Sequence, residues 1–303
     1  MKDPYLLHIF NPTKNVSPFD VNMAYEAEFD GVIPYSNVTL EEVYALTQDT
    51  IFSRGPTGVK RTGIFIGGRE FGLAIDMLNR AETAMVPPFE VSVFADPSGA
   101  ITTAAALLAA VEVWTKKLSG EDLSGKKIHI FGGTGPVGLC AGVLAEKCGA
   151  QVSIASHRGE EVARGAAREY NTRFDVKIDG ISSRTEDEIL SIVKGSDIII
   201  GAAKAGIRLV TKAQLQEAGK LMVAADVNAV PPSGIEGVDA NDMGKSLDFT
   251  PKKAVGIGAL AIGNIKYKVH HRMFELMKDA KKALFLDHEQ AFAAARELAA
   301  KIE

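Results

Sequence analysis

The chain has 303 residues, which suggests two domains at roughly 150 residues each. Hydrophobic residues make up 46% and charged residues 24%, a balance typical of a globular protein and not of a disordered one. The 34 Lys and Arg residues against 38 Asp and Glu residues leave a net charge of −4. This charge excludes a strongly basic surface that would attract nucleic acid or anionic lipid.

The sequence also argues against a membrane span and against export. The apolar stretch 99–111 ends at Glu112 and is shorter than the ~20 apolar residues that a membrane helix needs. Acidic and proline residues interrupt the first 12 residues, where a signal peptide would be apolar. Cys140 and Cys148 are expected on one helix about 12 Å apart, too far for a disulfide. We therefore expect reduced, packing cysteines and a cytoplasmic protein.

The predicted elements of the first hundred residues alternate between strand and helix. Strands are predicted at 6–10, 31–34, 63–66 and 90–94, and helices at 40–47 and 71–81. This alternation predicts a small α/β domain. The Ala- and Leu-rich stretch 102–117 predicts a strong helix that bridges to the rest of the chain.

The middle of the chain alternates more clearly. Strands are predicted at 126–131, 151–155, 175–178, 197–200 and 221–225, and helices at 136–148, 160–174, 185–194 and 211–218. This spacing predicts right-handed βαβ units and a parallel sheet. A last helix, predicted at 265–282, would return the chain to the first domain.

A glycine-rich turn between the first strand and helix of the middle region carries the clearest chemistry. The pattern G-x-G-x-x-G is formed by Gly133, Thr134, Gly135, Pro136, Val137 and Gly138. Its position after a strand and before a helix predicts a dinucleotide site, with a plain tight turn as the alternative. The first glycine would allow the turn, the second would let backbone approach a pyrophosphate, and the third would permit close helix–strand packing. The helix N-terminus would favour the phosphates.

These observations predict two α/β domains with a cleft between them. Residues 1–105, completed by C-terminal helices within 265–303, would form the smaller domain. Residues 106–264 would form a Rossmann-type domain with a parallel sheet that binds NAD(P).

The residues after the second strand of this domain indicate which dinucleotide binds. NAD sites usually place Asp or Glu there, but this sequence has Ser156, His157 and Arg158. An always-charged Arg beside a hydroxyl suits a 2′-phosphate, so we expect NADP to bind. Ser156 and His157 also suit a free 2′-OH, so NAD is expected as well. The alternative is that Arg158 is only a solvated loop charge.

Two later turns follow strands at the same predicted edge of the sheet, where open α/β sheets bind ligands. Ala202 and Ala203 are small enough for a nicotinamide ring to lie against the backbone, and Asp226 and Asn228 begin a Pro- and Gly-rich loop. We expect all four residues to bind the dinucleotide. The six histidines show no metal-ligand spacing, and the His270-His271 pair is expected on an exposed helix surface.

Several segments together resemble a known family. They are SPFDVNMA (17–24), IFSRGPTGVKRTGIFIGG (51–68), ADPSGAITTAAA (95–106), GGTGPVG (132–138), DVNAVPPSGIEGVDA (226–240) and GIGALAIGNIKYK (256–268). The combination resembles the bacterial methylene-tetrahydromethanopterin dehydrogenases over nearly the whole chain. Of the two types in that family, the chain looks more like the one that uses NAD or NADP and is dedicated to tetrahydromethanopterin.

The resemblance implies direct hydride transfer from the methylene carbon of the pterin carrier to nicotinamide C4, giving the methenyl cation. It implies no flavin and no metal, a cleft that excludes water, and a homo-oligomer. The reaction would serve formaldehyde oxidation in one-carbon metabolism, as in methylotrophy. The chemistry would belong to the cofactors, with the protein supplying orientation and electrostatics.

The resemblance also implies site residues. Lys266 matches the lysine that the family places near the pterin, where we expect it to orient the substrate; a solvated lysine is the alternative. Asp20 matches the acidic residue of the SPFD turn and is expected to bind the pterin ring, unless it only caps a helix. Asp96, Thr102 and Thr103 are also assigned to the substrate, with helix capping as the alternative for the two threonines.

Three other functions stay open at this point. The nearest is the same chemistry on methylene-tetrahydrofolate with NADP. The second is a dinucleotide-sensing protein without turnover, which would not need Lys266 and Asp20. The third is a shikimate-type dehydrogenase, which would need a Lys–Asp pair in the N-terminal domain; Lys60 and Asp96 are present but in other surroundings.

Overall fold

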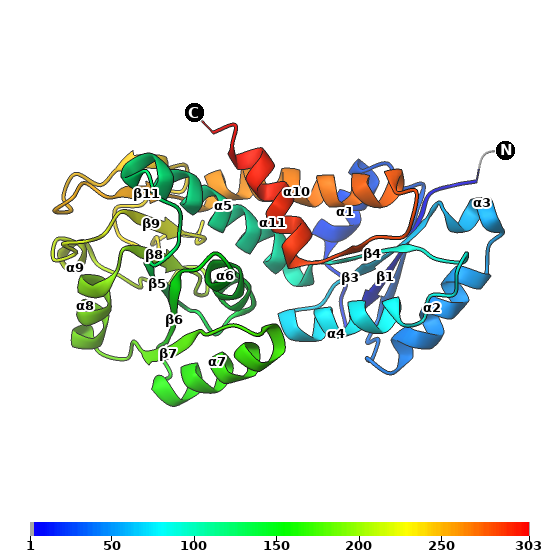
Figure 1. The fold of residues 1–303 in the computed structure, drawn as a ribbon, viewed down its shortest axis with the longest axis horizontal. Helices are drawn as coiled ribbons and strands as arrows, with labels where there is room; N and C mark the ends of the chain where they lie inside the picture. The colour runs from blue at the N-terminus through cyan, green and yellow to red at the C-terminus, as the bar shows by residue number, and fades with distance from the viewer. Residues whose placement is uncertain (1–2, 303) are drawn as a thin grey trace. The chain divides into compact units, whose positions relative to one another are not determined.

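A computed structural model describes residues 3–302, and these residues form two compact units (Figure 1). The first unit contains the described residues up to Thr102 together with Tyr267–Ala294. The second contains Thr103–Lys266 and the described residues from Ala295 onward. The division expected from the sequence lies at 105 and 265. The described residues from Ala295 onward belong to the second unit, whereas 265–303 is expected wholly in the first.

The first unit is built on a five-stranded sheet in which all strands run parallel. Its strands are β1 (Leu6–Asn11), β2 (Gly31–Ser36), β3 (Thr62–Ile66), β4 (Ser92–Ala95) and β12 (Phe285–Leu286). Its helices are α1 (Pro18–Glu26), α2 (Glu42–Phe52), α3 (Pro56–Val59), α4 (Phe71–Glu82) and a 3₁₀ turn at Pro97–Gly99.

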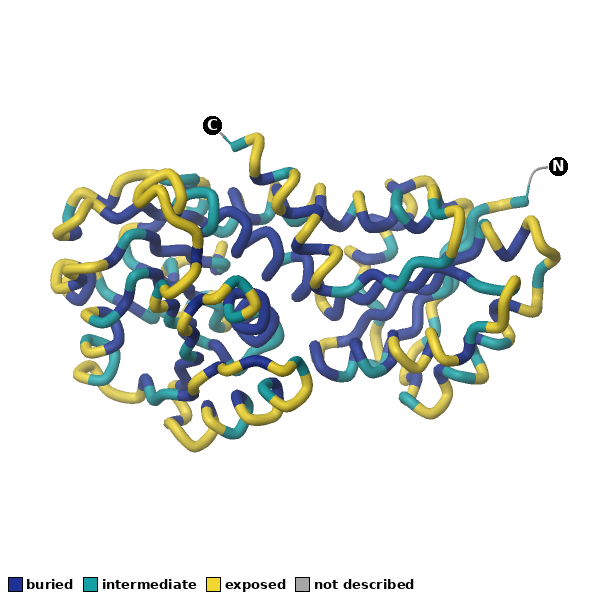
Figure 2. The backbone as a smooth tube through the Cα atoms, viewed as in Figure 1, coloured by how far each residue is buried: buried dark blue, intermediate teal, exposed yellow. Residues whose placement is uncertain are grey.

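The strand order of this sheet is β12-β4-β3-β1-β2. In chain order this is the 2-1-3-4-5 arrangement of flavodoxin-like folds, whose topological switch point lies between the first and third strands. Every residue of β3 and β4 is buried, because helices cover both faces of the sheet (Figure 2). The ends of β1 and β3 therefore define the expected ligand crevice of this unit.

The second unit is built on a seven-stranded sheet with one antiparallel strand. Its strands are β5 (Lys127–Phe131), β6 (Gln151–Ser156), β7 (Asp179–Ser182), β8 (Ile198–Gly201), β9 (Val223–Asp226), β10 (Met243–Ser246) and β11 (Val255–Ile257). Its helices are α6 (Pro136–Lys147), α7 (Glu160–Phe174), α8 (Glu186–Gly195) and α9 (Lys212–Leu215).

The order of this sheet is β10-β11-β9-β8-β5-β6-β7. Without the antiparallel edge strand β10, this is the 3-2-1-4-5-6 order of a Rossmann sheet, with its switch point between β5 and β8. The fold class predicted from the sequence, two α/β units with a Rossmann-type second one, is confirmed.

Three helices each have residues in both units: α5 (Ala100–Ser119), α10 (Ala259–Asp279) and α11 (His288–Ala299). The stretch 102–117, which is predicted to be helical, lies within α5, and the helix predicted at 265–282 overlaps α10. One helix in the described chain, over residues 97–119, is long and apolar enough to span a membrane by length and composition. In the most apolar part of this helix, 72% is buried inside the protein, as in the core helix of a globular fold.

Two local expectations were wrong. The third strand of the second unit begins at Asp179, not at Asp175, because Asp175 ends α7 in a left-handed conformation. The side chain of Asn171 then forms hydrogen bonds with both the N–H and the C=O of Ile178. The backbone of Ile178 is therefore paired with a side chain and not with a neighbouring strand. His270 is fully buried, while His271 is half-buried. Neighbours on a helix point in different directions, so only His270 faces the core.

Candidate functional site

The glycine-rich loop of the second unit lines a cavity of about 580 Å³ at the switch point of its sheet. The cavity is lined by Phe131, Gly132, Thr134, Gly135, Pro136, Ser156, His157, Arg158, Ser183, Ile189, Ala202, Ala203, Lys204, Ile207, Arg208 and Leu209. Its size falls within the ~300–1,000 Å³ typical of ligand pockets. Eight of the residues predicted to bind the dinucleotide thus lie together.

Two glycines of the loop region leave no room for a side chain. Gly132 has φ +69, and a Cβ there would lie 2.5 Å from the backbone of Ala203. A Cβ on Gly138 would lie 2.6 Å from Cα of Gly133, so α6 packs directly on the loop. The left-handed residue of the turn is therefore Gly132, which lies just before the G-x-G-x-x-G pattern. Gly133 and Gly138 serve packing and do not line the cavity, and neither does Val137.

The N-terminus of α6 opens into this cavity. Gly135 is its N-cap and Pro136 its first residue, and no side chain caps the helix. The free N–H groups and the partial positive charge of a helix N-terminus favour phosphates. This loop and helix end therefore fit the pyrophosphate of a dinucleotide.

Three cationic side chains surround the cavity. The guanidinium of Arg158 lies 3.5 Å from Oγ1 of Thr134, and the side chain is exposed. Lys204 and Arg208, which were not predicted, add two more positive charges; Arg208 lies 3.7 Å from Glu236. Ser156 is buried and its hydroxyl accepts the N–H of Arg158 over 3.1 Å, which fixes the start of the loop after β6. These positive charges favour a ligand that carries several negative charges.

Asp226 and Asn228 do not line the cavity. The carboxylate of Asp226 accepts the N–H groups of Asn228 and Ile235, while the amide of Asn228 binds Gly206 and Pro232. Burial raises the pKa of Asp226, and these backbone N–H groups oppose the rise. The two side chains hold the loops after β8 and β9 in shape, so direct contact with the dinucleotide stays a prediction.

A second pocket, of about 310 Å³, lies wholly in the first unit. Its walls come from the loops after β1, β3 and β4, at the switch point of that sheet. It is lined by Asn11, Thr13, Asn15, Val16, Ser17, Pro18, Asp20, Gly68, Arg69 and Ser98. Of these residues, only Asp20 is predicted from the sequence to bind the substrate. The others were missed because loop residues carry no periodic pattern.

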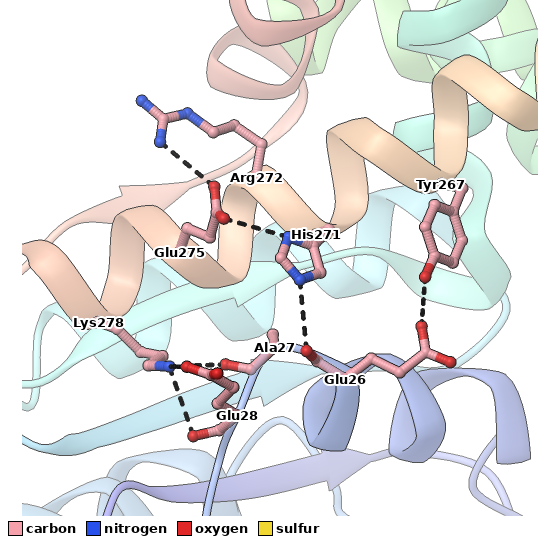
Figure 3. Close-up of polar contacts among 8 residues, drawn as sticks. All are labelled: Glu26, Ala27, Glu28, Tyr267, His271, Arg272, Glu275 and Lys278. Carbon is pink, nitrogen blue, oxygen red and sulfur yellow. Dashed lines mark hydrogen bonds and ion pairs between the residues drawn. The ribbon is translucent and has the colours of Figure 1, made fainter.

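Asp20 lies in the first turn of α1 and is 2% exposed. The N-cap of α1 is Ser17, so Asp20 is not the capping residue. Tyr267 and His271 of α10 bind Glu26, and Nζ of Lys278 lies 2.8 Å from the carbonyl oxygen of Ala27 (Figure 3). These contacts hold the C-terminal end of α1 on α10, so the helix that carries Asp20 is braced.

Asp96 and Thr102 have no exposed surface. The carboxylate of Asp96 accepts the N–H groups of Ile101 and Thr102, the hydroxyl of Thr102 at 2.6 Å and the ring N–H of His270 at 3.0 Å. Asp96 therefore caps α5, and neither threonine does. This geometry favours a positioning role for Asp96 and Thr102, and substrate contact by either stays a prediction.

The remaining predicted residues lie elsewhere. Thr103 is half-buried in the first turn of α5. Lys266 lies in the second turn of α10, which begins six residues earlier than expected, and its side chain is half-buried while that of Lys268 is exposed. Lys60 lines a different pocket, with Lys281 and Glu90, so Lys60 and Asp96 do not form a pair. Among residues 3–302 no three His, Cys, Asp or Glu side chains are grouped to hold a metal ion.

Comparison with known proteins gives concordant results. Residues 18–98 match the family described as methylene-tetrahydromethanopterin dehydrogenase, N-terminal. The chain is 45% identical to the NAD(P)-dependent methylenetetrahydromethanopterin dehydrogenase of Methylorubrum extorquens, over 97% of this chain and 98% of the relative. It is 33% identical to bifunctional protein MdtA of the same organism, over 97% and 99% of the two chains.

Among solved structures, shikimate 5-dehydrogenase of Listeria monocytogenes is similar in fold. The TM-score is 0.51 at 14% identity, with coverage of 97% of this chain and 96% of that chain. At this identity the likeness supports the two-unit fold and not the activity. The full-length identity to the Methylorubrum enzyme is decisive for the family. The chain belongs to the methylene-tetrahydromethanopterin dehydrogenases.

Proposed function

We propose that this protein oxidises methylene-tetrahydromethanopterin to methenyl-tetrahydromethanopterin and reduces NAD or NADP. The observation that carries the proposal is the 45% identity, over 97% of the chain, to an enzyme of that name. The two pockets, each at the switch point of its own sheet, support it independently, because the reaction needs one site for a dinucleotide and one for a carrier.

The residues around the larger cavity hold the dinucleotide. The nicotinamide, when bound, accepts the hydride that leaves the methylene carbon with both electrons of its C–H bond. The loop 132–135 and the N-terminus of α6 hold the pyrophosphate, and Arg158 binds the 2′-phosphate when NADP is the partner. Ala202 and Ala203 present a flat wall without long side chains.

Asp20 binds the pterin ring in the pocket of the first unit. Lys266 orients the substrate through a hydrogen bond. A charged ammonium is a poor stabiliser of the cation that forms, so Lys266 acts on the pose and not on the charge. The proposed reaction needs neither flavin nor metal, since hydride passes directly between the two carriers.

We further infer a role in formaldehyde oxidation in the cytoplasm, with the chain acting as a homo-oligomer. The cytoplasmic setting is supported by two free cysteines, Cys140 buried and Cys148 half-buried.

The test is to mix the purified protein with each methylene carrier and each dinucleotide and to follow the absorbance of the reduced nicotinamide and of the methenyl product. Turnover of methylene-tetrahydromethanopterin with both NAD and NADP, without turnover of the folate, is the expected result. Turnover of methylene-tetrahydrofolate with NADP alone would overturn the choice of carrier. Silence in all four mixtures, with dinucleotide still bound, would identify a sensor and overturn the enzyme.

A further inference from the structure

The pocket of the first unit contains a cation that no sequence pattern pointed to. We propose that Arg69 is a substrate-binding residue, an inference that rests on the proposed function. The guanidinium of Arg69 donates a hydrogen bond to the ring carbonyl of the pterin, and Asp20 accepts hydrogen bonds from the amino edge of the same ring. Both side chains line the one pocket of about 310 Å³.

The backbone that presents Arg69 is held on both sides. Gly68, just before it, has φ +102, and a Cβ there would lie 2.7 Å from Cγ of Pro12. The carbonyl oxygen of Gly68 accepts the hydroxyl of Ser98 over 2.8 Å. The turn is thus fixed between the loops after β1 and β4, and the position from which the Arg69 side chain starts is set before any ligand binds.

Ser98 is itself in an unusual conformation. Its φ of 52 and ψ of 28 lie in the left-handed region, which is unfavourable for a non-glycine residue. Such residues cluster at functional sites, where the surrounding structure enforces them. Here Ser98 lines the pocket and its hydroxyl holds the turn that carries Arg69.

The guanidinium of Arg69 is available to a ligand. Its side chain is exposed, and within residues 3–302 it makes no hydrogen bond or ion pair. Other arginines of the unit have structural partners: Arg61 lies 3.8 Å over the ring of Tyr5, and Arg80 lies 4.7 Å over that of Tyr44. Arg69 differs from them because it lines a pocket at the switch point of the sheet and has no such partner.

The chemistry of the pair matches a pterin. The pyrimidine part of a pterin places two N–H donors beside a carbonyl acceptor. A carboxylate only accepts and a guanidinium only donates, so Asp20 and Arg69 together satisfy both kinds of group. The volume is at the low end of the ~300–1,000 Å³ range of ligand pockets, which suits a bicyclic head group and not the whole carrier. The negative charge of Asp20 in the same pocket disfavours the anionic arm of the carrier.

The test compares Arg69→Met with wild type and with Arg80→Met, a control in the same unit outside this pocket. Affinity is measured by calorimetric titration of two ligands, tetrahydromethanopterin and the fragment 6-methyltetrahydropterin, which has the ring but no arm. Loss of one charge-assisted hydrogen bond should weaken both ligands about 10- to 100-fold. The affinity for NADP, and all affinities of Arg80→Met, should stay at the wild-type values.

A weaker full carrier with an unchanged fragment would mean that Arg69 contacts the arm, and an unchanged affinity for both would mean that it contacts neither. Either result overturns the proposal while leaving the proposed function intact, provided that wild type still oxidises the methylene carrier. A wild-type protein that oxidises no methylene carrier overturns the proposed function instead, and the fragment titration then reports on Arg69 by itself.

Discussion

Nδ1 of His270 lies 3.0 Å from Oδ2 of Asp96, and neither side chain has any surface exposed to solvent. His270 also makes edge contacts with the rings of Phe94 and Phe274. Asp96 follows the end of β4 and caps the start of α5, while His270 belongs to α10. The pair therefore joins the start of α5 to α10. It is a structural contact across 174 residues of sequence.

Removing one member of this pair should destabilise the protein strongly. His270→Ala leaves the buried carboxylate of Asp96 without its ring partner and opens a cavity among phenylalanines, so we expect the free energy of unfolding to fall by about 3–5 kcal/mol. Chemical denaturation measures this. The control is His271→Ala, because His271 is half-exposed and its contact with Glu275 should contribute less than about 1 kcal/mol. Equal losses in the two variants would contradict the buried pair.

Arg158→Ala should change the choice of dinucleotide. The guanidinium is expected to meet the 2′-phosphate, so the variant should bind NADP roughly 10- to 100-fold more weakly and bind NAD nearly as well as wild type. Titration with each dinucleotide gives the two dissociation constants. Arg164→Ala is the matched control, because Arg164 lies on α7 and pairs with Glu160. An equal loss of NAD and NADP would remove the role assigned to Arg158.

Lys266→Ala should lower turnover by at least about 100-fold, as expected when a group that orients the reactants is lost. The dissociation constant for NADP should stay near the wild-type value, since Lys266 is not among the residues that line the dinucleotide cavity. Lys268→Ala, two residues along the same helix and exposed, should keep full turnover. Steady-state rates of wild type, Lys266→Ala and Lys268→Ala test this prediction. Unchanged turnover in Lys266→Ala would refute the role of Lys266.

Gly132→Ala should damage both stability and dinucleotide binding. The new methyl group would require a left-handed alanine and would lie 2.5 Å from the backbone of Ala203, so the loss of stability should exceed about 1 kcal/mol. Thermal unfolding and NADP titration measure the two effects. Gly165→Ala provides the opposite case, because it lies within α7 with open space around it. That variant should gain about 0.5–1 kcal/mol and bind NADP normally.

The stability of the protein should depend on the ionisation of Asp226. Burial raises the pKa of this carboxyl above its ordinary value of 3.8, so the folded state holds its proton more tightly than the unfolded state. The contribution of this group to the free energy of unfolding is fully present below about pH 4. It is lost as the pH rises through the pKa that Asp226 has in the folded state. Relative to Asp226→Asn, wild type should therefore lose stability as the pH rises above about 4. Parallel unfolding curves of both proteins across this range measure the difference, and a constant difference would contradict the shift.

The local elements and the chemistry of the glycine loop could be predicted from the sequence. The helix 160–174 was predicted with its observed ends, and the strand–loop–helix around Gly135 was recognised, because hydrophobic periodicity and glycine spacing act over a few neighbouring residues. The buried runs of β3 and β8 likewise read as strands of a parallel sheet.

Which loop residues meet depends on the packing of distant segments and could not be predicted from the sequence. Arg69, Ser98 and Asp20 lie in three separate loops or helices, and their common pocket exists because β1 and β3 pair at the switch point of the first sheet. The contact between Asp96 and His270 joins residues 174 positions apart and could not be predicted from either segment alone. Such contacts depend on strand order and helix packing, which join residues far apart in the chain and leave no periodic signal in the sequence between them.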